Sequence, residues 1–156
     1  MADFELSRST HVDADPETVR ALLDDFREWV HWSPWEGVDP DLRRTYSGPE
    51  RGVGATYEWA GNKQAGEGRM RITSSDPAAV VLDLDFLKPF KASNVTRFDL
   101  VPSGGAGTGG GTDVSWTMTG RRGAVMSLMG RLFFDKAIGK DFDKGLAALK
   151  ATAEAR

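Results

Sequence analysis

The stretch that decides the fold runs from Gly123 to Ala155 and reads GAVMSLMGRLFFDKAIGKDFDKGLAALKATAEA. It contains no proline and carries an apolar stripe at helical spacing, which predicts one long C-terminal helix. Strand-like segments precede it. A helix that follows a curved sheet buries its stripe by lying across the sheet, and the space between the two layers can then become a pocket.

The apolar stripe of this helix changes direction near Asp135 and Lys136. The two sets of residues lie about a quarter-turn apart at helical periodicity, so we expect a bend or a change of packing partner. We expect the first part to cover the open end of the pocket and the second to close over the sheet, with close approach or bending at Gly130 and Gly139. The first set is Val125, Leu128, Met129, Leu132 and Phe133, and the second is Ile138, Phe142, Leu146, Leu149 and Ala153.

Composition limits the possible classes of protein. The 156 residues suit a single domain covering residues 1–156. The 20 Lys and Arg against 23 Asp and Glu lack the basic excess of a nucleic-acid binder. The absence of cysteine excludes disulfides, a thiolate nucleophile and cysteine-ligated metals. The charged N-terminus and the lack of a run of about 18 apolar residues predict a cytoplasmic protein that does not insert into a membrane.

The N-terminal third predicts one strand and two short helices. Phe4 to Val12 alternates as a strand does. Pro16 then suits the first position of a helix that Asp15 caps and that runs to about Asp24. We expect a second short helix from Phe26 to His31 and a turn at Trp32-Ser33-Pro34-Trp35-Glu36, because Pro34 disfavours helical geometry at Ser33.

Six further segments are short, alternate in polarity and end in turn residues, which predicts an antiparallel meander. They are Leu42–Ser47, Ala55–Ala60, Gly66–Thr73, Val80–Leu87, Ala92–Val101 and Thr112–Thr119. Alternation sorts their side chains into an apolar inner face and a charged outer face. The inner set is Tyr57, Trp59, Met70, Ile72, Leu82, Leu84, Phe86, Phe98, Leu100, Val114, Trp116 and Met118.

Two polar residues, Asn94 and Thr96, fall on the apolar face by the same alternation. Buried polar groups need partners, so these side chains are candidates for contacts with a ligand or a trapped water. A position at the sheet edge, or a hydrogen bond to a nearby loop, is an equally good explanation.

Motifs for catalysis are scarce. Gly105 to Gly110 satisfies G-x-G-x-x-G by letter, but a strand follows it where a dinucleotide site needs a helix. Phosphate-loop, serine-hydrolase and zinc-protease signatures are absent, and we expect no metal and no cofactor. His31 and Glu36 are weak candidates for acid–base work at a pocket mouth, since both adjoin the tryptophan-rich turn.

The chain resembles the polyketide cyclase/dehydrase group of the SRPBCC (START-like) superfamily. The resemblance implies an α+β helix-grip fold, in which a seven-stranded antiparallel sheet wraps around a long C-terminal helix and two short N-terminal helices close one end. It also implies a deep apolar cavity, without a universal catalytic motif. The segments that carry the resemblance are Ala14-Asp15-Pro16 with Val19, Trp32 to Glu36, Gly54 to Trp59, Gly66 to Met70, Lys88-Pro89-Phe90, Thr112 to Met118, Ile138 to Phe142, Gly145-Leu146 and Leu149-Lys150.

Three functions fit these observations. The first is binding of a hydrophobic small molecule, such as a lipid, a polyketide or an aromatic compound, between the sheet and the helix. The second is a cyclase or dehydratase acting in the same cavity, and the third is a docking module of the co-chaperone type. The residues expected to line the cavity are Trp32, Trp35, Tyr57, Trp59, Met70, Ile72, Leu84, Phe86, Asn94, Thr96, Phe98, Trp116, Met118, Met129, Phe133 and Phe142.

Overall fold

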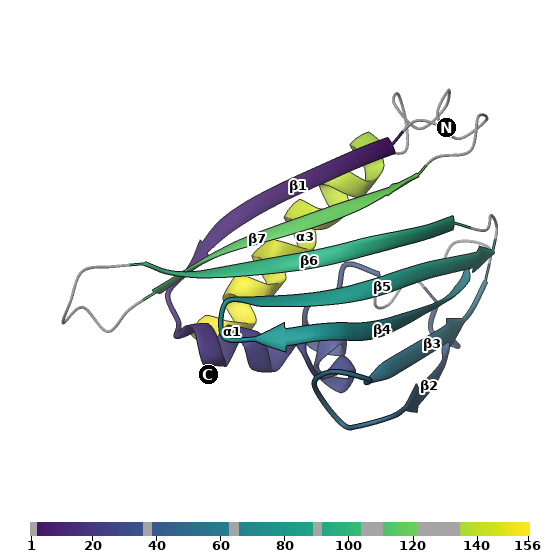
Figure 1. The fold of residues 1–156 in the computed structure, drawn as a ribbon, viewed down its shortest axis with the longest axis horizontal. Coiled ribbons are helices and arrows are strands. Elements are labelled where there is room, and N and C mark those ends of the chain that lie inside the picture. The colour runs from purple at the N-terminus through teal and green to yellow at the C-terminus, as the bar shows by residue number, and fades with distance from the viewer. Residues whose placement is uncertain (1–2, 36–38, 63–65, 89–91, 104–110, 122–134) are drawn as a thin grey trace.

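A single antiparallel sheet forms the body of the molecule, and one long helix lies across it (Figure 1). The computed structural model describes residues 3–35, 39–62, 66–88, 92–103, 111–121 and 135–156. The strands are β1 (Asp3–Val12), β2 (Arg43–Ser47), β3 (Thr56–Ala60), β4 (Glu67–Asp76), β5 (Ala79–Lys88), β6 (Ala92–Ser103) and β7 (Gly111–Arg121). The helices are α1 (Pro16–Leu23), the 3-10 helix η1 (Phe26–His31) and α3 (Asp135–Glu154).

The strands follow the spatial order β1-β7-β6-β5-β4-β3-β2, so the chain forms a meander from β2 to β7 and β1 pairs with the last strand. The predicted meander is therefore confirmed, and β1 adds the seventh strand. α3 packs mainly against β1, and it runs toward α1 and η1, which lie together at one end of the sheet (Figure 1).

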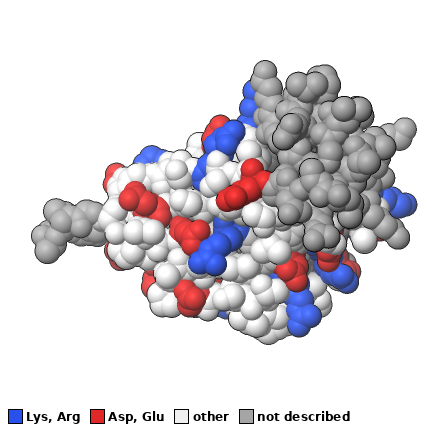
Figure 2. Space-filling model, turned by 45° about the horizontal axis from the view of Figure 1, so that its top comes forward, with Lys and Arg blue, Asp and Glu red and all other residues white. Residues whose placement is uncertain are grey.

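The sorting of side chains into two faces is also confirmed. Register pairs Tyr57 with Met70 and Met70 with Leu84, so these inward residues form one row across the sheet. On the outer face, Arg69 lies 3.3 Å from Asp85. Figure 2 shows positive and negative side chains interspersed over the described residues of one face, as expected for charges that pair in water.

Helix α3 buries the members of the second predicted apolar set whose side chains are described, which leaves out Ile138. Phe142, Leu146, Leu149 and Ala153 are each at most 2% exposed. The first apolar set and Gly130 lie outside the described residues. The bend expected where the stripe changes direction involves the same undescribed segment. Among the described helices, none is long and apolar enough to cross a membrane.

Two local predictions need correction. Asp15 occupies the N-cap position of α1, but its side chain makes no capping hydrogen bond, and its backbone carbonyl accepts from Val19 instead. Several strands also run further than predicted. A register shift between Ile72 and Ser74 interrupts the alternation in β4, so the sequence did not reveal that the strand continues. β6 continues through Pro102, beyond the end of its pairing with β5.

Candidate functional site

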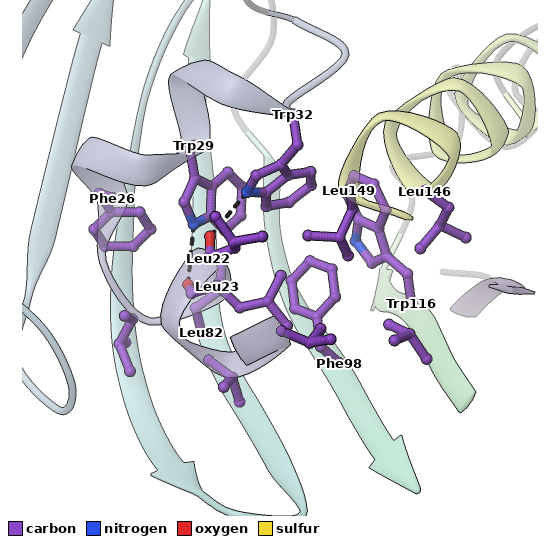
Figure 3. Packing of buried hydrophobic residues seen from close by; sticks show 14 of the residues in the cluster. Leu22, Leu23, Phe26, Trp29, Trp32, Leu82, Phe98, Trp116, Leu146 and Leu149 are labelled. Carbon is purple, nitrogen blue, oxygen red and sulfur yellow. Dashed lines mark hydrogen bonds between the residues drawn. The ribbon is translucent and has the colours of Figure 1, made fainter. Parts of the chain in front are cut away.

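The end of α1 holds two tryptophans in place: Trp29 in η1 and Trp32, the residue directly after η1. Helix ends leave backbone carbonyls without intrahelical partners. The indole N–H of Trp29 donates to the carbonyl of Leu23 at 2.9 Å, and that of Trp32 donates to the carbonyl of Leu22 at 2.8 Å (Figure 3). Both rings are thereby held against the sheet, where they make edge contacts with Phe98.

An aromatic cluster around Trp116 joins the sheet to α3. The Trp116 ring stacks on Phe142 and meets the edges of Trp32 and Trp35. Trp35 also donates from its indole nitrogen to Asp141 of α3 at 3.2 Å. Trp32, Phe98, Trp116 and Phe142 were all predicted to line a cavity, but in this cluster they contact one another, so this end of the interlayer space is densely packed.

The remaining predicted lining residues lie further along the sheet, away from α1. Two rows cross the inner face here: one contains Tyr57, Met70, Leu84 and Asn94, and the other contains Ile72, Leu82, Thr96 and Met118. All eight are buried. Met129 and Phe133, which were expected to cover them, lie outside the described residues.

Trp59 and Phe86 form an aromatic wall beyond these rows, and both are partly buried. The indole of Trp59 lies directly over Gly68, where a Cβ atom would come within 2.4 Å of the ring. The edge of one ring meets the face of the other, with centroids 6.1 Å apart. Glycine at position 68 therefore leaves room for the indole of Trp59 to approach the backbone of β4.

Three polar atoms on the inner face are buried without a hydrogen-bond partner among the described residues. They are Oδ1 of Asn94, Oγ1 of Thr96 and Nε1 of Trp116. Asn94 is 6% exposed and Thr96 is 2% exposed. The alternation-based placement of Asn94 and Thr96 on the apolar face is confirmed, and the edge-position explanation is wrong because β6 lies between β5 and β7.

The described catalytic candidate, His31, does not lie on this face. His31 lies at the surface, with its ring nitrogen 3.6 Å from a carboxylate oxygen of Glu28. Glu36 lies outside the described residues. The inward-facing described residues of β3 to β7 include no carboxylate, histidine or lysine. This part of the sheet offers hydrogen bonds and apolar contact, and lacks a group suited to proton transfer near neutral pH.

Sequence reasoning missed Arg8, which is paired with Trp116 and so faces inward from β1. Its guanidinium lies 3.7 Å from Asp143 and packs against Gly139, where a Cβ atom would come within 2.6 Å of it. Close approach at Gly139 was predicted and is confirmed. The signal for Arg8 was present in the alternation of Leu6, Arg8 and Thr10, but this charged residue was left out of the inward series.

The residues that the structure describes contain no group of three or more histidine, cysteine, aspartate or glutamate side chains able to hold a metal ion. The inward-facing residues of the described strands likewise carry no cluster of positive charge that would neutralise a phosphate group. What they provide is a broad apolar surface with a few isolated hydrogen-bonding atoms.

Solved structures similar to this chain share its fold at low sequence identity. The di-domain aromatase/cyclase BexL from the BE-7585A biosynthetic pathway has a TM-score of 0.72 and 16% identity, and the match covers 99% of this chain and 51% of that one. A protein from Thermobifida fusca has a TM-score of 0.69 and 23% identity over 97% of this chain and 93% of its own. The Aha1 dimer from Colwellia psychrerythraea gives 0.66 and 17%, over 97% and 96%.

A search of curated protein sequences found no match. The family model described as polyketide cyclase / dehydrase and lipid transport matches residues 3–154, which is nearly the whole chain. The seven-stranded antiparallel sheet, the C-terminal helix and the short N-terminal helices are the elements of the helix-grip fold. The chain belongs to the polyketide cyclase/dehydrase group of the SRPBCC (START-like) superfamily.

Proposed function

We propose that this protein binds a hydrophobic small molecule between the sheet and α3. The observation that carries the proposal is the pair of buried side chains, Asn94 and Thr96, whose oxygens have no partner among the described residues. An unsatisfied buried polar atom costs about 1–3 kcal/mol. A bound molecule that supplies the missing hydrogen bonds removes that cost, and the apolar rows around the two residues supply its binding energy.

The family match supports the same function, since its description includes lipid transport as well as cyclases and dehydrases. The aromatic wall of Trp59 and Phe86 adds large flat surfaces suited to a ring or an acyl chain. The proposed binding region is the end of the inner face away from α1, bounded by Tyr57, Leu84 and Asn94.

The test begins with mass spectrometry of whatever co-purifies with the protein, followed by thermal-shift screening of hydrophobic compounds. A ligand at 100 times its dissociation constant stabilises the fold by about 2.7 kcal/mol. If nothing co-purifies and no hydrophobic compound raises the melting temperature, the proposal fails.

Two substitutions on β5 then locate the site. Leu84 faces inward and is 5% exposed, whereas Leu87 is 46% exposed. Leu84→Trp fills the proposed region and should weaken binding at least tenfold, while Leu87→Trp should leave binding unchanged. Leu84→Phe serves if the larger side chain prevents folding, which circular dichroism reports. Equal affinity in the inward and outward variants would exclude this region as the site.

Cyclisation or dehydration of a polyketide-like chain in the same region is a second candidate, favoured by the family description and by the fold shared with BexL. With no carboxylate, histidine or lysine among the described inward residues of β3 to β7, such a reaction would depend on folding the substrate and on hydrogen bonds from Thr96 and Asn94. Turnover of a poly-β-ketone thioester that depends on Thr96 would favour this function; binding without turnover would favour the first.

A further inference from the structure

The three residues with unpartnered polar atoms lie in a line on the inner face, with Thr96 between Asn94 and Trp116. Asn94 and Thr96 are two residues apart on β6 and face the same way, so their Cα atoms are roughly 7 Å apart. Thr96 is paired with Met118, which makes Trp116 its diagonal neighbour on β7, at roughly 7–8 Å. A single ring system spans the distance from Thr96 to either of these two neighbours.

Their cross-strand neighbours in the described sheet are uncharged. The cross-strand neighbours of Asn94 are Leu84 and Gly120, and those of Thr96 are Leu82 and Met118. A carboxylate, phosphate or ammonium group placed here would be buried without a counter-charge from these strand neighbours, which is strongly unfavourable.

The arginines on the same side of the sheet belong to the two edge strands. Arg8 on β1 is two strands from Thr96, and its guanidinium lies 3.7 Å from Asp143. Arg44 on β2 is four strands from Asn94 and exposed. Neither provides a free positive charge beside the unpartnered atoms.

The hydrogen-bonding capacity of the three atoms is complementary to a hydroxyl group. Asn94 Oδ1 can only accept, Trp116 Nε1 can only donate, and Thr96 Oγ1 can do both. A hydroxyl donates one hydrogen bond and accepts others, so it satisfies either an acceptor or a donor at this position. A methyl group satisfies neither, and a carboxylate cannot donate to Asn94.

We infer that the site is selective for an uncharged, hydroxyl-bearing apolar ligand, an alcohol or a phenol, and that Asn94 and Thr96 determine this selectivity. The inference rests on the proposed function, because it assigns the ligand class of the same binding region. It excludes free fatty acids and other anionic amphiphiles as the preferred ligands.

The test compares probes that differ in one group on the same frame. 2-Naphthol, 2-methylnaphthalene and 2-naphthoate form one series, and 1-decanol, n-undecane and undecanoate form the other. Dissociation constants are measured by titration calorimetry at pH 7, where both hydroxyl compounds are uncharged. We expect the hydroxyl member of at least one series to bind about tenfold more tightly than its methyl and carboxylate counterparts.

Substitutions connect this selectivity to the named residues. Thr96→Val removes the hydroxyl at constant shape and should abolish the preference for the hydroxyl member, while binding of the methyl member is kept. Thr96→Ser should restore the preference, and Asn94→Leu should reduce it. Thr119→Val, on the outward face of β7, is the matched control and should behave as the wild type.

The outcomes distinguish failure of the inferred selectivity from failure of the proposed binding function. Equal binding of hydroxyl and methyl members, or a preference for the carboxylates, overturns the inference while the proposed function stands. The same holds if the hydroxyl preference survives in Thr96→Val. If no member of either series binds, the proposed function fails and the inference fails with it.

Discussion

The indole of Trp116 and the ring of Phe142 are stacked, with centroids 4.0 Å apart and planes 10° apart. Trp116 belongs to β7 and Phe142 to α3, so this pair joins the sheet to the helix that crosses it. Both side chains are at most 1% exposed. The stack sets the distance between the two layers at the packed end, and the region beyond it along the sheet is where a ligand is proposed to lie.

Gly145 permits this close approach. A Cβ atom at this position would come within 2.9 Å of both the Trp116 ring and the Pro34 ring. Gly→Ala in a helix normally stabilises by up to about 1 kcal/mol. Here we expect Gly145→Ala to lower the free energy of unfolding by about 1–3 kcal/mol, because the Trp116 ring cannot move aside without losing its stacking contact with Phe142. Urea unfolding measures the change, and a gain in stability would show that the helix shifts freely.

Asp24 is a buried carboxylate at the end of α1, and it is 1% exposed. Its Oδ2 accepts hydrogen bonds from Arg51 at 3.2 Å and Ser75 at 3.4 Å, and its Oδ1 lies 3.1 Å from the same Arg51 nitrogen as an ion pair. Arg20 approaches Oδ2 to 3.8 Å. The side chain thus ties the 48–54 segment and β4 to α1.

We expect Asp24→Asn to lower the free energy of unfolding by about 2 kcal/mol. Hydrogen bonds to charged groups contribute about 1.5–3 kcal/mol each, and the half-exposed Arg51 can recover some hydration when its partner is neutralised. Asp83→Asn on the outward face of β5 is the control, with a change within about 0.5 kcal/mol. Chemical denaturation of the two variants compares them, and equal effects would contradict the structural role of Asp24.

The sequence predicted the fold well because its signals are local. Period-two alternation located the strands, and Pro16 marked the start of α1. The same alternation assigned inward and outward faces correctly over most of the sheet. It failed at the register shift after Ile72, since a bulge interrupts the two-residue period of the strand.

The candidate site was less predictable, because burial on the inner face does not distinguish a cavity wall from solid packing. Trp32 and Trp116 were expected to line a cavity, yet their rings pack edge to face, 5.6 Å apart. That contact joins the end of η1 to β7 and depends on tertiary structure. The inward position of Arg8 became clear only with its partners on α3, Gly139 and Asp143.

His11 gives stability a dependence on pH near neutrality. Its Nδ1 lies 2.8 Å from Asp113 and its Nε2 2.9 Å from Asp13. These hydrogen bonds raise the pKa of His11 above 6.5, that to Asp113 having the larger effect. A raised pKa in the folded state means that the stabilisation is complete below about pH 6.5 and is lost as the pH rises through the folded-state value.

Melting temperatures between pH 5.5 and 9 compare the wild type with His11→Gln. The wild type should lose stability relative to the variant as the pH rises. Parallel curves would show that protonated His11 gains nothing from the two carboxylates.

Glu154 should act with the opposite sign at acidic pH. The backbone N–H of Asp13 and the Lys150 ammonium both donate to it, at 2.8 Å and 2.7 Å, and lower its pKa below 4.5. Its contribution to stability is therefore present above about pH 4.5 and is lost as the pH falls through the lower folded-state value. Glu154→Gln should flatten the acid limb of the stability curve between pH 5 and 3, and an unchanged limb would assign acid sensitivity to other carboxylates.

Thr96 and Thr112 form a matched pair for testing whether a hydroxyl on the inner face lacks a partner in the ligand-free protein. Both residues are at most 2% exposed. The Thr112 hydroxyl donates to the carbonyl of Ala14 at 2.7 Å, whereas the Thr96 hydroxyl has no partner among the described residues. Substitution by valine removes the hydroxyl at nearly constant volume in both cases.

We expect opposite signs in the ligand-free protein. Thr112→Val should lower the free energy of unfolding by about 1–2 kcal/mol, because it breaks a hydrogen bond and leaves the Ala14 carbonyl unpaired. Thr96→Val should raise it by about 1 kcal/mol, since a desolvated hydroxyl is replaced by a methyl group that packs against Leu82 and Met118. Urea unfolding of the ligand-free protein gives both values. A loss of stability in Thr96→Val as large as that in Thr112→Val would mean that trapped water or the chain itself already satisfies Thr96, which would remove the reason for a ligand to bind there.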